Sequence, residues 1–251
     1  MDARAWQQFV ALEREHWWFR GRRTVYLALL RAHLGGRRPE RALDVGCGVD
    51  GFLGELAQLS PRVAGCDPEL AALQHARARG LAPVAAASSE RLPVAAASQD
   101  LVCLFDVLEH LDDDAAALAE VRRVLRPGGV CFASVPAWPI LFANNDRVAH
   151  HRRRYTRRDL RRRFESAGLA VERNTCANVL LFPAIAAAVL ALKVVEALLP
   201  RASSHTNLSL RMPRPLNALC YRLFAAELAL TRRWDFPLGH SIALVARRPP
   251  A

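Results

Sequence analysis

The 251-residue sequence predicts an α/β fold in which helices surround a mostly parallel β-sheet. From Arg41 onward, short apolar runs alternate with segments of helical period, which is the pattern of βαβ units. A glycine turn of the form G-x-G-x-x-G follows the first apolar run, with Gly46, Gly48 and Gly51 at its glycine positions. Such a turn lies where a buried strand passes into a helix and lets the backbone approach a ligand.

Strands and helices are predicted to alternate in the first half of the chain. Strands are expected near residues 41–45, 62–66, 82–86, 100–105 and 129–135, and helices over 51–59, 69–79 and 112–125. The second of these helices opens after Pro68, and the third begins at an aspartate cluster, which suits a helix N-terminus. Pro127 and the two glycines after it end the third helix.

The second half adds further elements. Thr156, with Asp159 three residues later, resembles a capping box, so a helix is expected over 157–167, ended by Gly168. A strand over 169–174, an amphipathic helix from Leu216 to about Arg232 and a strand over 241–246 follow. These elements predict three parts: an N-terminal helical lid over 1–38, a core over 39–176 and 240–248, and an apolar helical cap inserted over 177–239.

One segment of the cap, residues 178–199, is unusually apolar, with no polar residue from Val179 to Leu192. A membrane-spanning helix needs about 20 apolar residues. Because Pro183 interrupts the segment and charged residues follow it, we expect a buried helix or one that lies on a membrane surface. Peripheral membrane contact through this segment therefore remains an open alternative.

The charge and the cysteines narrow the class of protein. The net charge is +11, but Lys193 is the only lysine among 35 basic residues. Such an excess of arginine is what a GC-rich coding sequence would give, so the charge does not indicate a nucleic acid partner. The arginine-rich run 152–163 fits a solvated helix face. Six scattered cysteines without C-x-x-C pairs predict reduced thiols and no zinc site built from cysteines, and the polar N-terminus does not resemble a signal peptide. We expect a cytoplasmic protein, with membrane association left open.

Two acidic residues beside the glycine turn point to the kind of ligand. Asp44 precedes the first glycine by two residues, where a carboxylate would repel a pyrophosphate but would suit an ammonium group. Asp67 ends the second predicted strand, where a carboxylate can accept both hydroxyls of a ribose. Asp67 fits NAD as well as S-adenosylmethionine, so an NAD-linked enzyme is the first alternative to an enzyme that uses S-adenosylmethionine.

Five ordered motifs then give a resemblance to a family. They are 43–51 around the glycine turn, Asp67, the loop 90–93, Asp106 to His110 and 125–129. With these motifs the chain resembles the class I S-adenosylmethionine-dependent methyltransferases over about residues 40–175. The resemblance implies a Rossmann-like sheet of seven strands whose last strand is reversed, and S-adenosylmethionine as cofactor.

The resemblance also implies the cofactor-binding residues. These are Asp44, Gly46, Cys47, Gly48, Asp67, Pro68, Ser88 or Ser89, and Asp106, together with Arg22 from the segment 16–23, which is similar to one in small-molecule methyltransferases. Asp106 is expected to close over the methionine end and the serines to meet the adenine. The chain departs from the family's commonest pattern at Ser88, where an aspartate is usual.

A metal site is a further hypothesis. Asp106, Glu109 and His110 form a D-x-x-E-H pattern similar to the E-x-x-E-H segment of ubiquinone-pathway O-methyltransferases, which is implicated in divalent-metal binding. Such ligands can hold Mg²⁺ or Zn²⁺ beside an acceptor. An E-H pair without any metal is the plainer interpretation.

An oxygen acceptor also needs a base. His110, His151 and Tyr155 are the catalytic candidates because the fold places them in loops that face the crevice, although each also suits a structural role. The sequence thus predicts methyl transfer from S-adenosylmethionine to a small, partly apolar or lipid-like acceptor at oxygen. A non-catalytic module that binds the cofactor is the second alternative, and no feature specifies an oligomeric state.

Overall fold

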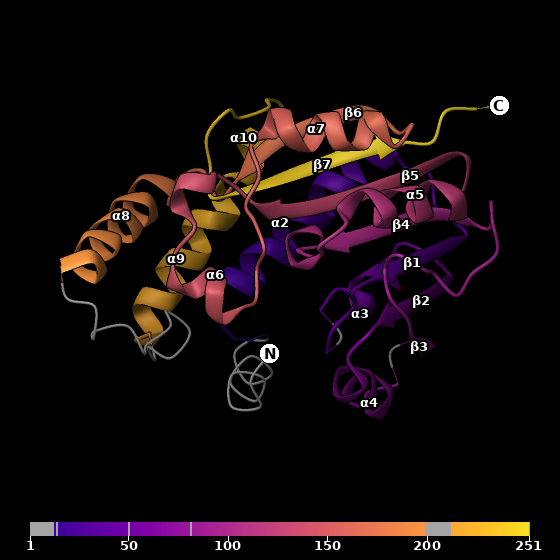
Figure 1. Ribbon diagram of the computed structural model, residues 1–251, viewed down its shortest axis with the longest axis horizontal. Coiled ribbons are helices and arrows are strands. Elements are labelled where there is room, and N and C mark those ends of the chain that lie inside the picture. The colour runs from indigo at the N-terminus through magenta and orange to yellow at the C-terminus, as the bar shows by residue number, and fades with distance from the viewer. Residues whose placement is uncertain (1–12, 14, 50, 81, 199–211, 251) are drawn as a thin grey trace.

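A seven-stranded sheet organises the computed structural model, which describes residues 13–250 except 14, 50, 81 and 199–211 (Figure 1). Its strands are β1 (Arg41–Val45), β2 (Arg62–Asp67), β3 (Val84–Ala86), β4 (Gln99–Phe105), β5 (Leu125–Pro136), β6 (Ala170–Ala177) and β7 (Ser241–Arg247). They lie in the order β3-β2-β1-β4-β5-β7-β6, and β7 runs antiparallel to both its neighbours while the other pairs are parallel. The predicted sheet with a reversed last strand is confirmed.

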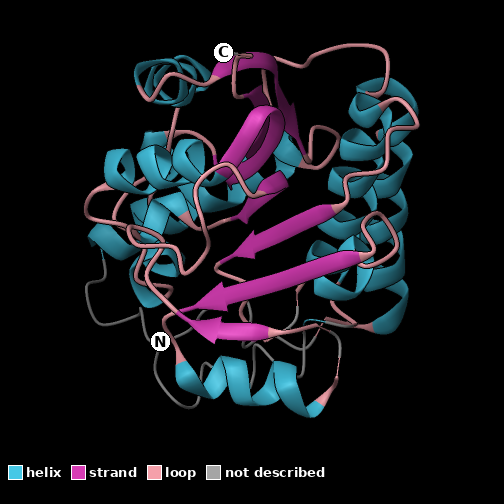
Figure 2. Ribbon diagram, turned by 90° about the vertical axis from the view of Figure 1, so that its right-hand side faces the viewer, coloured by secondary structure: helices cyan, strands magenta, loops and turns pink. Residues whose placement is uncertain are grey.

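Helices cover both faces of the sheet (Figure 2). They are α2 (Trp17–Leu34), α3 (Leu53–Leu56), α4 (Leu70–Ala78), α5 (Asp114–Val124), α6 (Asn144–Val148), α7 (Arg157–Ser166), α8 (Phe182–Leu198), α9 (Arg214–Ala226) and α10 (Leu228–Thr231), with short 3₁₀ turns η1 (Leu108–His110) and η2 (Pro139–Leu141). Two of the expected N-caps form. Asp113 accepts from the amides of Ala115 and Ala116, and Thr156 accepts from the amide of Asp159.

The strands bury alternate residues in two apolar layers, as the period of two requires. On β4, Val102 and Leu104 belong to the layer beneath α5 and α7, which includes Leu118 and Phe164. The intervening residues Leu101, Cys103 and Phe105 belong to the opposite layer, beneath α2, α3 and α4. All six cysteines are free, and five are buried. They pack as apolar side chains, which agrees with the expected reduced thiols.

Several boundaries differ from the sequence prediction. The helix expected over 51–59 is reduced to α3, because residues 51 and 52 before it and residues 57–59 after it are turns. The strand expected over 169–174 extends to Ala177, where its pairing with β7 continues to Ser241. The sequence did not predict η1, η2 or α6, which are too short to show a period. Residues 1–12 of the expected lid and residues 199–211 of the expected cap lie outside the described residues.

In the described part of the chain, the helices α8, α9 and α10 follow β6 and precede β7 in the sequence. Phe224 of α9 is buried against α2, where a Cβ on Gly21 would lie 2.1 Å from its ring, so glycine permits this close approach. Glu227, between α9 and α10, accepts from the amides of Asn178 and Val179 at 2.6 Å each and so holds the corner that follows β6. No helix in the described part of the chain combines the length and hydropathy needed to cross a bilayer.

The strand order determines where a ligand would bind. From β1 the chain adds β2 and β3 on one side of β1, and then β4 and β5 on its other side. The direction in which strands are added therefore reverses between β1 and β4. In open α/β sheets, ligands bind outside the carboxyl ends of the strands at this point. The glycine turn, Asp67 and Asp106 follow or end β1, β2 and β4, so they meet at this edge.

Candidate active site

The turn after β1 combines close packing with an open side. Gly46 and Gly48 have φ angles of 73° and 57°, which glycine adopts without steric cost. The amides of Gly46 and Cys47 donate to the carbonyl of Cys66 at 2.7 and 3.1 Å. A Cβ on Gly46 would lie 2.5 Å from Val107 Cγ2, whereas one on Gly48 would meet no atom within 4 Å. A ligand can therefore approach the backbone at Gly48.

Asp67 fastens this turn to the end of β2. Its Oδ2 accepts from the amide of Gly48 at 2.9 Å, and its Oδ1 accepts from the amide of Glu69 at 2.8 Å. Burial raises the pKa of Asp67, and the two amides oppose that shift. Each oxygen keeps a further lone pair, so the carboxylate can still accept the two hydroxyls of a ribose. Pro68 follows it and is exposed.

Asp44 is the buried carboxyl group of the site. Its side chain is 1% exposed, and its Oδ1 has no hydrogen-bond partner among the described residues. Burial, and then the negative charge of Asp67, raise the pKa of Asp44 well above its ordinary value. An unsatisfied buried polar atom costs about 1–3 kcal/mol. A ligand ammonium would remove that cost, because it would supply both a donor and a positive charge.

Arg22 reaches the end of β4 from α2. Its Nη2 lies 2.7 Å from Asp106 Oδ2, and Ser134 Oγ donates to Asp106 Oδ1 at 2.8 Å. The guanidinium also lies over the ring of Trp18, 4.2 Å from its centroid, and its buried Nε has no hydrogen-bond partner in the described part of the chain. Asp106 has a φ of 55°, which an aspartate adopts only when its surroundings hold it. The structure thus joins two predicted cofactor residues in one ion pair.

The remaining predicted cofactor residues follow β1 and β3. Ser88 is exposed and its hydroxyl donates to Glu90 at 3.2 Å, whereas Ser89 is buried. Cys47 is also buried, and burial raises the pKa of its thiol, so the thiol stays neutral. Cys47 therefore offers its backbone to a ligand more readily than its side chain.

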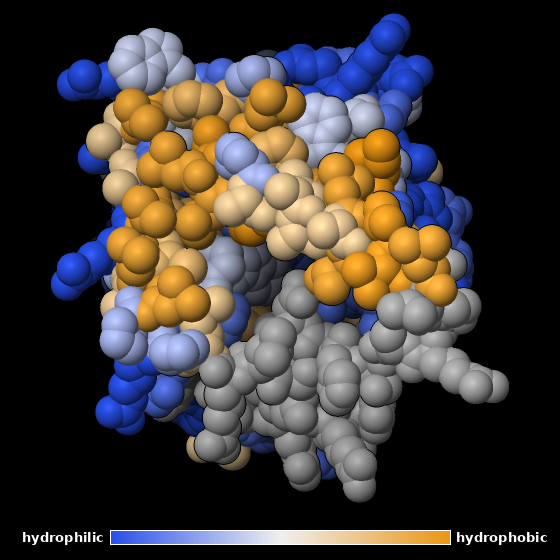
Figure 3. Space-filling model, turned by 90° about the vertical axis from the view of Figure 1, so that its left-hand side faces the viewer, coloured by the Kyte–Doolittle hydropathy of each residue, from blue (hydrophilic) through white to orange (hydrophobic). Residues whose placement is uncertain are grey.

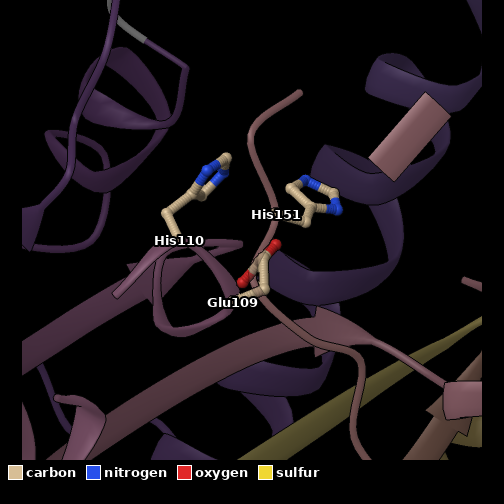
Figure 4. Close-up of side chains that lie close together, drawn as sticks. All are labelled: Glu109, His110 and His151. Carbon is tan, nitrogen blue, oxygen red and sulfur yellow. The ribbon is translucent and has the colours of Figure 1, made fainter. Parts of the chain in front are cut away.

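The side chains of Glu109, His110 and His151 lie close together (Figure 4). One oxygen of Glu109 and one ring nitrogen of each histidine lie within 4.8 Å of one another, and the two rings meet edge to face at 4.7 Å. Glu109 is fully buried, and neither carboxyl oxygen has a partner among the described residues. Burial, and then Asp106, raise the pKa of Glu109 well above its ordinary value. Burial, and then His151, lower the pKa of His110 to about 4. At neutral pH the imidazole of His110 is therefore neutral. Burial disfavours the ionised form of Glu109.

Asp146 is a member of this region that sequence reasoning missed. Its Oδ1 lies 2.8 Å from His151 Nδ1 and accepts from Arg154 Nε at 2.8 Å. No sequence signal marks it, because α6 is only five residues long and its contact with His151 arises from the fold of the loop.

Tyr155 lies apart from the cluster. It is 2% exposed, and its hydroxyl donates to Asp114 Oδ2 at 2.7 Å and lies 3.0 Å from the carbonyl of Leu108. Burial and the Asp114 carboxylate raise its pKa. Its hydroxyl is thus engaged in the protein interior and ties the loop before α7 to η1 and α5.

The structure assembles a different metal-ligand set from the one expected. Asp106 is engaged by Arg22 and Ser134, and His151 takes its place beside Glu109 and His110. One carboxyl oxygen and two imidazole nitrogens are donor types that Zn²⁺ accepts. Burial, however, raises the pKa of Glu109 and so disfavours the ionised carboxylate that a cation needs. We therefore interpret the cluster first as a group of proton donors and acceptors.

Comparison with known proteins identifies the family. A model of the methyltransferase domain matches residues 18–174, which include every candidate site residue. A protein of Mycolicibacterium smegmatis, named a probable S-adenosylmethionine-dependent methyltransferase, is 36% identical over 165 residues, 64% of this chain and 62% of the relative. A ubiquinone biosynthesis O-methyltransferase of Rhizobium rhizogenes is 35% identical over 128 residues, 44% of this chain and 51% of the relative.

Solved structures agree on the fold. An S-adenosylmethionine-dependent methyltransferase of Mesorhizobium loti aligns with a TM-score of 0.57 at 21% identity, covering 90% of this chain and 98% of that one. The match to the two relatives spans only 62% and 51% of their length. The chain belongs to the methyltransferase domain family and has the fold of the class I S-adenosylmethionine-dependent methyltransferases.

Proposed function

We propose that this chain transfers the methyl group of S-adenosylmethionine to an oxygen of a small, partly apolar acceptor. One observation carries the proposal: two sets of groups meet at the carboxyl ends of β1, β2 and β4. The first set is the glycine turn with Asp44 and Asp67, and the second is the cluster of Glu109, His110 and His151. The first suits a charged nucleoside, and the second can take a proton from an acceptor.

The contacts of the first set support a role for each residue. Asp44 would receive the ammonium of the methionine moiety, and the backbone of Gly46, Cys47 and Gly48 would lie against the same moiety. Asp67 would accept from the ribose hydroxyls. The adenine would be bordered by Pro68, Ser88 and Ser89. Arg22 offers a buried, unpartnered Nε beside Asp106, which suits the methionine carboxylate. These groups fit the cofactor in charge and in hydrogen bonding.

The second set supports oxygen as the acceptor atom. When bound, S-adenosylmethionine supplies a methyl group on a positively charged sulfur, so the reaction depends on alignment and on an available nucleophile. A hydroxyl becomes a good nucleophile only as its proton leaves. His110 and His151 can accept that proton, and Tyr155 anchors the loop that carries His151. The similarity to a ubiquinone biosynthesis O-methyltransferase supports the same atom.

The cap supports an acceptor with an apolar part. Exposed apolar side chains gather on α8 and α9, and Figure 3 shows apolar surface on the side of the molecule where these helices lie. This apolar face consists of Leu190, Leu192, Val194, Val195 and Leu198 on α8, and Leu216, Leu219 and Leu223 on α9. Arg214 and Arg222 of α9 are also exposed. An apolar helical face with arginines suits the surface of an anionic membrane. We propose peripheral contact there, which would bring a lipid-like acceptor to the site.

Calorimetric titration tests the cofactor. The purified chain is titrated with S-adenosylmethionine, S-adenosylhomocysteine and NAD, and Asp67→Ala is the control. Binding of both sulfur nucleosides, lost in the control, is expected. Binding of NAD alone would overturn the proposal. Binding of S-adenosylmethionine without turnover across a panel of hydroxylated acceptors would favour a non-catalytic module.

Flotation with lipid vesicles tests the membrane contact. The chain is expected to bind vesicles that contain phosphatidylglycerol more strongly than vesicles of phosphatidylcholine alone, and Val194→Glu with Leu198→Glu should abolish that binding. Leu70, exposed on α4, provides the matched control Leu70→Glu. Equal flotation of the control and of the double variant would reject the α8–α9 face as the contact.

A further inference from the structure

Asp146 holds the loop between η2 and α7 from inside. It is 1% exposed, and its Oδ2 accepts from the amide of Ala143 at 2.8 Å. Its backbone carbonyl accepts from the amide of His151 at 2.8 Å, so main chain and side chain both contact that histidine. Arg154, which donates to Asp146 Oδ1, also donates to the carbonyl of Ala137 just beyond β5. The carboxylate is therefore fixed to the edge of the sheet.

The hydrogen bond to His151 determines which ring nitrogen is free. Arg154 Nε donates to Asp146 Oδ1 and the amide of Ala143 donates to Oδ2, each at 2.8 Å, so a guanidinium and a backbone N–H both favour the ionised carboxylate. An ionised carboxylate has no proton to donate, so His151 Nδ1 must be the donor across the 2.8 Å contact. In the neutral ring, Nε2 then carries the free lone pair.

Three titratable side chains lie close to the imidazole of His151. His110 lies edge to face with it at 4.7 Å, Glu109 lies within the 4.8 Å cluster, and Asp146 lies on the Nδ1 side. Arg154 also bonds Asp146 and offsets part of its charge. His151 is the member of the cluster that has a carboxylate to orient it, because neither oxygen of Glu109 has a partner among the described residues.

We propose that Asp146 is a positioning residue that makes His151 the proton acceptor of the methyl transfer. This inference rests on the proposed function and deepens it. The hydroxyl proton of the acceptor passes to His151 Nε2, and an oxygen lone pair forms the new O–CH₃ bond. The C–S bond breaks with its electron pair left on sulfur, which gives neutral S-adenosylhomocysteine. Asp146 stabilises the imidazolium so formed and remains ionised.

Asp146→Asn tests the role in turnover. It is expected to lower kcat by about 10²-fold, with the affinity for S-adenosylhomocysteine unchanged and with partial rescue by Asp146→Glu. The rising limb of the pH profile should move to lower pH, because loss of a carboxylate disfavours the imidazolium. A residue with only a structural role would not move that limb. Asp112→Asn, at an exposed aspartate paired with Arg152, is the matched control and should keep wild-type turnover.

Nitrogen NMR of histidine-labelled protein tests the geometry without any acceptor. His151 should carry its proton on Nδ1 in the wild-type chain and lose that preference in Asp146→Asn. A proton on Nε2 in the wild-type chain, or unchanged turnover in Asp146→Asn, would overturn the inference. Failure of the proposed function would look different, because the wild-type chain itself would then bind no S-adenosylhomocysteine or would turn over no hydroxylated acceptor.

Discussion

Arg22 on α2 and Asp106 at the end of β4 form a nearly buried ion pair, with 2.7 Å between Nη2 and Oδ2. Ser134 holds the other oxygen of Asp106, and Trp18 covers the guanidinium. The pair connects the N-terminal helix to the candidate active site. Its rigidity explains how Asp106 keeps a left-handed backbone.

Arg22→Met is expected to weaken S-adenosylhomocysteine binding and to destabilise the fold by about 3 kcal/mol, because Asp106 would lose its partner in a largely buried place. Calorimetry and urea unfolding measure the two effects. Adding Asp106→Asn should restore most of the stability but not the affinity. Arg20→Ala, on the same helix over the ring of Tyr221, is the control. Full affinity in Arg22→Met would exclude Arg22 from the cofactor site.

The sheet and the cofactor edge are predictable from sequence because their signals are local. Asp67 and Asp106 each follow an apolar run, and the glycine turn directly follows β1. The carboxyl ends of parallel strands share one edge, so the residues that follow them meet without any further information.

The acceptor side is less predictable because it depends on tertiary contacts. The bond between Asp146 and His151 requires α6, whose five residues show no period. Tyr155 and His151 are close in sequence, yet the loop turns one toward Asp114 and the other toward Glu109. Similarly, nothing in the sequence places Arg22 beside Asp106.

Gly46→Ala should destabilise the fold more than Gly36→Ala does. Both glycines have positive φ angles, 73° and 84°, but only a Cβ at Gly46 would meet Val107, at 2.5 Å. We expect a loss of about 1 kcal/mol at Gly36 and about 2–4 kcal/mol at Gly46, measured by urea unfolding. Val107→Ala combined with Gly46→Ala should recover part of the difference. Equal losses at the two glycines would contradict the packing argument.

Removal of divalent metal should leave methyl transfer unchanged. Burial raises the pKa of Glu109 and so disfavours the ionised carboxylate that a cation needs, and Asp106 is held by Arg22. The chain is treated with EDTA and assayed with and without added Mg²⁺ or Zn²⁺. Activity that disappears with EDTA and returns with either ion would instead assign Glu109, His110 and His151 as metal ligands.

Glu227 should make stability depend on pH between about 4.5 and 7. It is fully buried, and burial raises its pKa from 4.5 to about 7 although two amides donate to it. The folded state therefore binds more protons than the unfolded state in that range, and the free energy of unfolding falls as pH rises. The loss amounts to about 3 kcal/mol at most. Glu227→Gln cannot ionise, so its stability relative to the wild-type chain should improve steadily from pH 4.5 to 7 in urea unfolding. Glu165→Gln, on the exposed side of α7, controls for the loss of one charge. A difference between wild type and Glu227→Gln that stays constant with pH would show that Glu227 titrates alike in both states.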